Sequence, residues 1–172
     1  MNKKFSTKLI VRQGIIAALY AVLTLAFPNL SYGPLQFRAS EVLVLLAFFN
    51  GEYIWGLTIG CFIANMFSPY ISDIIVGTFA SFLAAYLMSK LKNIWIASLM
   101  PAIANILVGI QIYVISNSKV AFFLTTGQIM LSEIIIVTLI GVPVFKILIR
   151  NKQVVNYLKL NKENKIYIKN NG

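Results

Sequence analysis

The chain has 172 residues, of which 59% are hydrophobic and only 12% are charged. Its 15 basic and 5 acidic residues give a net charge of +10, and it contains one cysteine, Cys61, and no histidine. This composition predicts an all-α integral membrane protein of one domain, because a soluble core does not need so many apolar side chains. It excludes an internal disulfide, a zinc site of cysteine and histidine ligands, and a histidine-based catalytic triad.

Two further function classes are disfavoured. The aromatic residues lie within apolar runs, which is not the interleaved basic and aromatic surface of a nucleic-acid binder. The sequence has no GxxxxGK[ST] loop for binding ATP, so energy for any uphill work would come from an ion gradient or a partner.

The apolar run near the N-terminus is interrupted by Arg12 and Gln13 and lacks a cleavage signature, so we interpret it as a retained first span.

The number of membrane crossings depends on the apolar region Val42–Phe67, which Asn50, Gly51 and Glu52 interrupt. A crossing needs about 20 residues, so hydropathy alone allows one long helix or two short ones. Basic clusters at the N-terminus, at Lys90 and Lys92 and at the C-terminal end share the cytoplasmic side only if this region crosses twice. We therefore expect a six-helix bundle in the cell membrane with both termini cytoplasmic. Its single domain, residues 1–150, has helices at about 9–27, 35–49, 53–67, 73–90, 94–115 and 120–149.

Residues 151–172 form an expected basic cytoplasmic tail. A solvated segment attracted to anionic lipid is favoured over a binding domain.

The stretch Tyr32–Glu41 (YGPLQFRASE) lies between apolar segments and holds a charged pair. Gly33 and Pro34 favour a turn, and Arg38 and Glu41 lie one helical turn apart, where their side chains can meet. Ionisable groups near hydrocarbon are costly and commonly functional. The alternative is an interfacial helix start, with Glu41 at the helix N-terminus and Arg38 extended to the lipid–water boundary.

In the expected topology, one set of polar and aromatic residues falls in the outer half of the bundle and forms the candidate substrate site: Phe37, Arg38, Glu41, Asn65, Asp73, Gln111, Tyr113, Gln128 and Glu133. Glu133 is the strongest candidate, because a charge within an apolar helix costs roughly 2.5–3.5 kcal/mol. Each member also has a structural alternative. Glu133 could pair with Arg38, Asp73 could cap a helix, the amides could join helices, and the aromatic residues could form an interfacial belt.

Carboxylates and amides accept and donate hydrogen bonds in planar pairs, so this inventory is compatible with a purine-like base. Separately, small residues repeat at four-residue spacing on several segments, among them Ala17 and Ala21. Such stripes allow close approach of helices, either within this chain or to another protein.

Five stretches carry a resemblance to a known family: Tyr32–Glu41, Ile59–Pro69, Asp73–Gly77, Pro101–Tyr113, and Ser132–Glu133 with Gly141–Pro143. They resemble the QueT family, whose members are S components, the substrate-binding membrane subunits of energy-coupling-factor (ECF) transporters. The resemblance covers about residues 10–150. It implies six helices and import of a 7-deazaguanine queuosine precursor such as 7-aminomethyl-7-deazaguanine or queuine. Enzymatic activity is not expected, because the sequence offers no histidine and only isolated carboxylates.

The same resemblance implies assembly with a transmembrane coupling protein and two ATPase subunits, and it matches Ala17 and Ala21 to the partner-contact pattern of S components. Our hypothesis is that the Tyr32–Glu41 loop closes over the substrate and that Glu133 accepts hydrogen bonds from its guanine-like edge. The chain departs from the family pattern at Gln111, where an acid is typical. We expect no cofactor and no metal. A stand-alone cation-coupled transporter is the main alternative, and a membrane-embedded enzyme or a purely structural subunit are the others.

Overall fold

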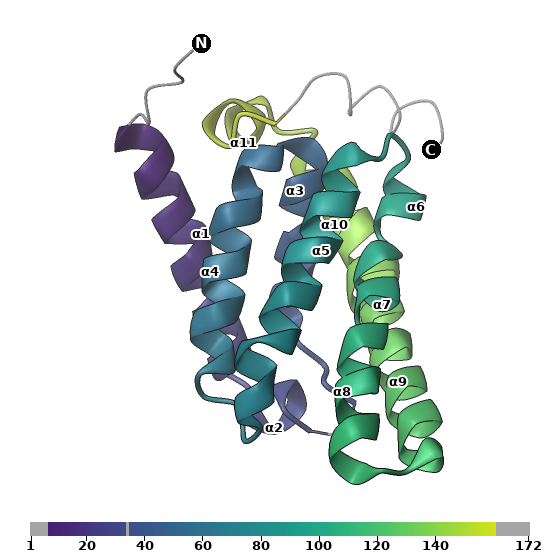
Figure 1. Ribbon diagram of the computed structural model, residues 1–172. Helices are drawn as coiled ribbons and strands as arrows, with labels where there is room; N and C mark the ends of the chain where they lie inside the picture. The colour runs from purple at the N-terminus through teal and green to yellow at the C-terminus, as the bar shows by residue number, and fades with distance from the viewer. Residues whose placement is uncertain (1–6, 34, 161–172) are drawn as a thin grey trace.

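The computed structural model describes residues 7–33 and 35–160, and every element of secondary structure in these ranges is helical (Figure 1). Within these residues, four helical stretches are long and apolar enough to cross a membrane, as judged by length and composition: Thr7–Leu25, Ile71–Lys90, Ile94–Ser116 and Lys119–Leu148. The described part of the chain is therefore all-helical and typical of a membrane protein. The segments between the first two of these stretches are shorter.

The first half of the bundle begins with α1 and continues through short 3-10 segments that lead into helices. Its elements are α1 (Thr7–Leu25), α2 (Pro28–Ser31), η1 (Ala39–Val44), α3 (Leu45–Phe49), η2 (Gly51–Tyr53), α4 (Ile54–Asn65), η3 (Ile71–Ile74) and α5 (Val76–Lys90).

The second half contains two long stretches, each built from several pieces. Its elements are α6 (Ile94–Ala97), α7 (Met100–Ala104), α8 (Ile106–Ser116), α9 (Lys119–Glu133), the π-helix η4 (Ile134–Gly141), α10 (Val142–Leu148) and α11 (Lys152–Tyr157). In Figure 1, α11 and the start of α1 lie at one end of the bundle, whereas α2 and the α8–α9 turn lie at the other.

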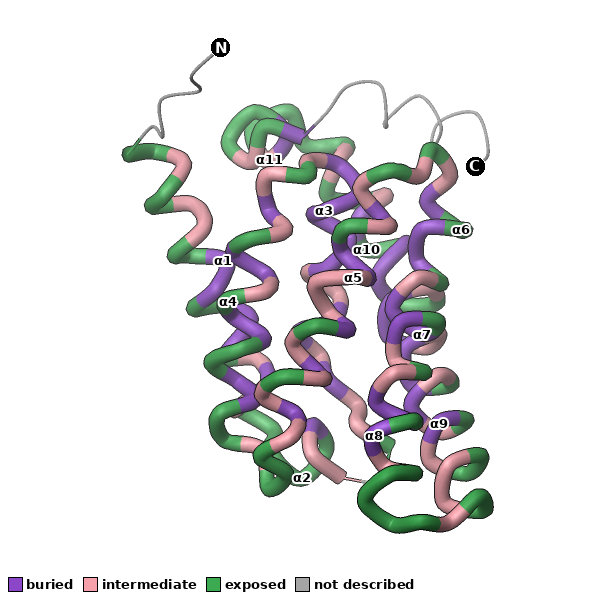
Figure 2. The backbone as a smooth tube through the Cα atoms, in the orientation of Figure 1, coloured by how far each residue is buried: buried purple, intermediate pink, exposed green. Residues whose placement is uncertain are grey.

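The second expected helix begins at Ala39 and not near residue 35. Gln36 has a left-handed backbone with φ of 45°, and Arg38 is extended with φ of −100° and ψ of 107°, so neither continues a helix. The remaining stretch, Ala39–Phe49, is short but lies at the centre of the bundle. All five residues of α3 are buried, which explains why this segment is apolar on every side (Figure 2).

Helices α1 and α4 pack directly against each other through glycines of α4. A Cβ atom at Gly60 would lie 2.8 Å from the Ala17 carbonyl oxygen and 2.8 Å from Tyr20 Cβ. At Gly56, the backbone N–H donates to Gln13 Oε1 at 2.8 Å, so a side chain of α1 partners an amide in the first turn of α4. The small-residue stripe of α4 therefore serves packing inside this chain.

The region expected to be a solvated tail begins with a packed helix. Val155 and Leu160 are each 5% exposed, and Tyr53 Oη donates to the Leu158 carbonyl at 2.9 Å. Asn50 Nδ2 donates to the Lys159 carbonyl at 3.1 Å. Residues 151–160 thus cover the turn between α3 and α4, while the rest of the expected tail, 161–172, lies outside the described residues.

We expect Gly60→Val to lower the free energy of unfolding by about 1–3 kcal/mol, because the new side chain meets backbone atoms of α1 that cannot rotate away. The measurement is an unfolding titration of the protein in detergent micelles. Gly127→Val is the matched control, since no atom lies within 4 Å of a Cβ at that exposed position. Equal stability of the two variants would contradict the close α1–α4 contact.

Candidate functional site

Six residues with a charged or amide side chain are buried in the described part of the bundle: Arg38, Glu41, Asn65, Asp73, Gln111 and Glu133. All six belong to the predicted site, although they are spread over almost 100 positions of the sequence. The fold therefore gathers them from the loop before η1, from η1, η3, α4, α8 and α9.

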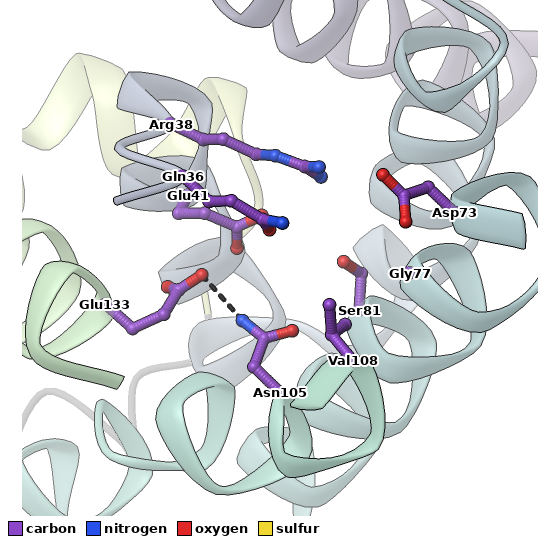
Figure 3. Close-up of a pocket in the computed structure, with 9 residues that line it drawn as sticks. All are labelled: Gln36, Arg38, Glu41, Asp73, Gly77, Ser81, Asn105, Val108 and Glu133. Carbon is purple, nitrogen blue, oxygen red and sulfur yellow. Dashed lines mark hydrogen bonds between the residues drawn. The ribbon is translucent and has the colours of Figure 1, made fainter. Parts of the chain in front are cut away.

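The four charged residues of this set line one small cavity, which we call the inner pocket (Figure 3). They are Arg38, Glu41, Asp73 and Glu133. It is lined by Gln36, Arg38, Glu41, Asp73, Gly77, Ser81, Asn105, Val108 and Glu133. Its volume is about 10 Å³, room for about one water molecule. Three carboxyl groups thus face a single guanidinium across a space that is closed to a larger molecule.

Arg38 is held by hydrogen bonds to the surrounding backbone and amide groups. Its Nη1 donates to Asn65 Oδ1 at 3.0 Å, and its Nε donates to the Ser31 carbonyl at 3.3 Å. Its Cζ lies 5.6 Å from the centroid of the Tyr32 ring, within the range of a cation–π contact. Arg38 is 7% exposed, so it does not extend to a lipid–water boundary as the alternative interpretation required.

Tyr32 belongs to the loop before η1, which also contributes Gln36 and Arg38 to the inner pocket. Its hydroxyl donates to the Ala64 carbonyl, which joins the loop to the end of α4. Burial raises the pKa of the Tyr32 phenol above its ordinary value, and the nearby Arg38 guanidinium partly opposes that shift. The phenol therefore stays protonated and available as a donor at neutral pH.

The Glu41 side chain hydrogen-bonds to the first helix and not to the Arg38 side chain. Tyr20 Oη of α1 donates to Glu41 Oε1, and both residues are buried. Next to them, the hydroxyls of Thr24 and Ser40 are 2.7 Å apart, and Ser31 Oγ donates to the Thr24 carbonyl at 2.8 Å. The expected helical-turn contact between Arg38 and Glu41 is thus replaced by separate networks, because Arg38 precedes the helix on extended backbone.

Glu133 lies at the end of α9, where the α-helix changes into the π-helix η4. Asn105 Nδ2, at the junction of α7 and α8, donates to Glu133 Oε1 at 2.8 Å, in place of the pairing with Arg38 considered as an alternative (Figure 3). The other carboxylate oxygen, Oε2, is buried without a hydrogen-bond partner among the described residues. Such an atom is costly to leave alone, and it marks a position where a ligand donor would fit.

A second and larger space, which we call the outer cavity, has a volume of about 320 Å³. It is lined by Tyr32, Gly33, Gln36, Tyr70, Asp73, Gln111, Ile112, Ile115, Ser116 and Thr125. Gln36 and Asp73 also line the inner pocket, so these two residues form the boundary between the two spaces.

Gln111 and Asp73 are joined at this boundary. Gln111 Nε2 donates to Asp73 Oδ1 at 2.7 Å and to Ser72 Oγ at 2.7 Å. Ser68 Oγ donates to Asp73 Oδ2, and Asn65 Nδ2 donates to the Asp73 carbonyl at 3.0 Å. Gln111 Oε1 is a second buried acceptor that lacks a partner within the described ranges.

Four predicted residues do not line either space: Phe37, Asn65, Tyr113 and Gln128. Asn65 is buried beside the inner pocket and holds Arg38 and the Asp73 backbone through its amide. Tyr113 is 36% exposed and meets Phe122 edge-on with ring centroids 6.3 Å apart, Gln128 is half-buried, and Phe37 packs against the central core. Their roles in binding stay predictions. Ala17 and Ala21 are buried within this chain, at 5% and 6% exposure, so their contact with a partner also stays a prediction.

Sequence reasoning did not include Gln36 or Asn105 in the site. The only signal for Gln36 was its place in the predicted turn, because its left-handed backbone and its boundary position are properties of the folded loop. Within residues 7–33 and 35–160, no group of three or more His, Cys, Asp or Glu residues is arranged to hold a metal ion.

Comparison with known proteins identifies the family. A family model described as QueT transporter matches residues 10–150, most of the chain. The chain belongs to the QueT transporter family. This confirms the resemblance seen in the sequence motifs.

One relative is described as "Queuosine precursor transporter QueT" from Lactococcus lactis subsp. cremoris (strain MG1363), and it is 51% identical over 77 residues. These residues are 44% of this chain and 46% of the relative, so the match spans less than half of either protein. No solved structure matches the chain.

Proposed function

We propose that this protein is the substrate-binding membrane subunit of an ECF-type importer, and that it takes up a queuosine precursor such as 7-aminomethyl-7-deazaguanine or queuine. The observation that carries the proposal is that Glu133, which is 3% exposed, lines a polar pocket inside an apolar bundle while its Oε2 atom has no hydrogen-bond partner among the described residues. A guanine-like edge carries adjacent N–H donors that match a carboxylate. Membership of the QueT transporter family supports the same substrate class.

The charges around the inner pocket favour a ligand with a cationic substituent. Glu41, Asp73 and Glu133 face Arg38 alone, so the lining has more acidic than basic side chains. Both proposed precursors carry an amine next to the ring system, and its ammonium form would balance part of this excess. Gln111 is neutral and donates to Asp73, so Asp73 is the carboxylate that lies at the boundary between the two spaces and could accept that amine.

Binding requires the inner pocket to open, because about 10 Å³ does not hold a bicyclic base. The loop that precedes η1 is the element best placed to move, since Gln36 separates the inner pocket from the outer cavity. Displacement of Gln36 would join the two spaces and expose Glu133 to a ligand from the outer cavity. The loop would then close over the bound substrate.

The proposal includes a membrane topology of six crossings with both termini cytoplasmic. Ala39–Phe49 and α4 are short, but they run in opposite directions between the two ends of the bundle (Figure 1). Lys90 and Lys152 then lie at the cytoplasmic end, and Lys119 and the Arg38 loop lie at the outer end. The outer cavity faces the side from which a substrate arrives.

Glu133→Ala is expected to weaken binding of 7-aminomethyl-7-deazaguanine about 10–100-fold, because the ligand donors lose a charged acceptor. The measurement is isothermal titration calorimetry on the purified protein. Glu52→Gln, in the turn between α3 and α4, is the control and should bind as the unchanged protein does. Unaltered affinity in Glu133→Ala would defeat the assignment of Glu133.

The topology predicts opposite labelling of two matched variants. Lys119→Cys and Lys152→Cys each place a thiol at the exposed first residue of a helix, and native Cys61 is fully buried. A membrane-impermeant maleimide should label Lys119→Cys in intact cells and Lys152→Cys only after permeabilisation. The reverse pattern would put the substrate cavity on the cytoplasmic side and contradict import.

The assignment as an S component predicts that uptake depends on partner subunits. Radiolabelled precursor should accumulate in cells that express this chain with a coupling protein and two ATPase subunits, and not in cells that lack them. Uptake without those subunits would instead favour a stand-alone transporter driven by a cation.

A further inference from the structure

The outer cavity is larger than an aminomethyl group needs, and its lining differs from that of the inner pocket. Ile112, Ile115, Tyr32 and Tyr70 contribute apolar and aromatic surface, whereas the inner pocket is lined mostly by charged and polar side chains. A volume of about 320 Å³ lies at the lower limit of small-molecule sites, which begin at about 300 Å³. The cavity therefore has room for a ring and surfaces suited to hydrocarbon.

This apolar lining contains one buried hydrogen-bond acceptor without a partner. Gln111 is 8% exposed, and its Nε2 is committed to Asp73 and Ser72, so the side-chain amide is fixed in orientation. Its Oε1 has no partner among the residues that the structure describes. A ligand hydroxyl placed in the outer cavity would satisfy that atom.

The three acceptors lie in a sequence that a single elongated ligand could follow. Glu133, whose Oε2 lacks a partner among the described residues, lines the inner pocket; Asp73 lines both spaces; and Gln111, whose Oε1 likewise lacks a partner, lines the outer cavity. Figure 3 shows Asp73 and Glu133 extending into the inner pocket from different helical segments. The order is a carboxylate, a second carboxylate, and then a neutral amide within apolar surface.

We propose that the outer cavity is a subsite for the side arm of the ligand, and that the preferred substrate is a 7-deazaguanine whose amine carries a hydroxylated hydrocarbon ring, as in queuine. The inference rests on the proposed function. The base would contact Glu133, the secondary ammonium would contact Asp73, and the ring would pack on Ile112 and Ile115 with a hydroxyl donating to Gln111 Oε1. An unsubstituted aminomethyl group reaches Asp73 but does not extend into the outer cavity, so it leaves Gln111 Oε1 unpaired.

The test compares the dissociation constants of queuine and 7-aminomethyl-7-deazaguanine for the purified full chain by calorimetry. Queuine should bind at least about tenfold more tightly, because it adds a hydrogen bond and buried apolar area. Ile115→Trp fills the outer cavity from a side chain that is 59% exposed, so folding should tolerate it. It should weaken queuine about tenfold or more and leave the aminomethyl compound within about twofold.

Two further variants sharpen the comparison. Ile110→Trp makes the same change on the same helix at an exposed position outside the cavity lining, and it should alter neither affinity. Gln111→Leu should reduce the factor by which queuine binds more tightly than 7-aminomethyl-7-deazaguanine. This factor is the right quantity to compare, because an effect of the substitution on Asp73 weakens the binding of both ligands equally and cancels. Equal affinity of the two ligands, or equal weakening of both by Ile115→Trp, would overturn the subsite and leave the proposed function standing. If neither ligand binds, the proposed function fails together with the subsite.

Discussion

Polar groups buried within an apolar bundle must find partners inside the chain, and this constraint organises the whole protein. In lipid, water is not available to satisfy a buried carboxylate or amide. Tyr20 therefore donates to Glu41, Asn65 accepts from Arg38, and Gln111 and Ser68 donate to Asp73. These contacts join α1, α4, η3 and α8, so the groups that form the site also hold the helices together.

The same constraint makes the exceptions informative. Among the buried acceptors around the two cavities, Glu133 Oε2 and Gln111 Oε1 lack a partner within the described ranges, and each belongs to a side chain that another hydrogen bond already orients. An oriented and unsatisfied acceptor is a preorganised contact for a ligand that supplies the donor. A site of this kind discriminates strongly, because an analogue without the matching donor leaves the buried atom unpaired.

The close approach of α1 and α4 determines where these groups lie. Gly60 lets the two backbones meet beside Tyr20, so the Tyr20 hydroxyl can reach Glu41 in η1. The left-handed backbone of Gln36 and the extended backbone of Arg38 then turn the chain into the bundle ahead of Ala39. One short stretch of chain thus contributes Arg38 and Glu41 to the inner pocket and Gln36 to the boundary between the two spaces, whereas Asp73, Gln111 and Glu133 come from other elements.

Composition and motifs determined the class of this protein, because a chain this apolar needs a lipid environment and because the family motifs are local in sequence. The buried charged residues were also identifiable, since an ionisable group such as Glu133 in an apolar helix stands out without any structure. The partners of those groups were not. Arg38 and Glu41 are one turn apart in sequence yet bond to Asn65 and Tyr20, and Gln36 acquires its position only when the loop folds. Such contacts depend on helix packing between segments distant in sequence, and only the tertiary structure decides them.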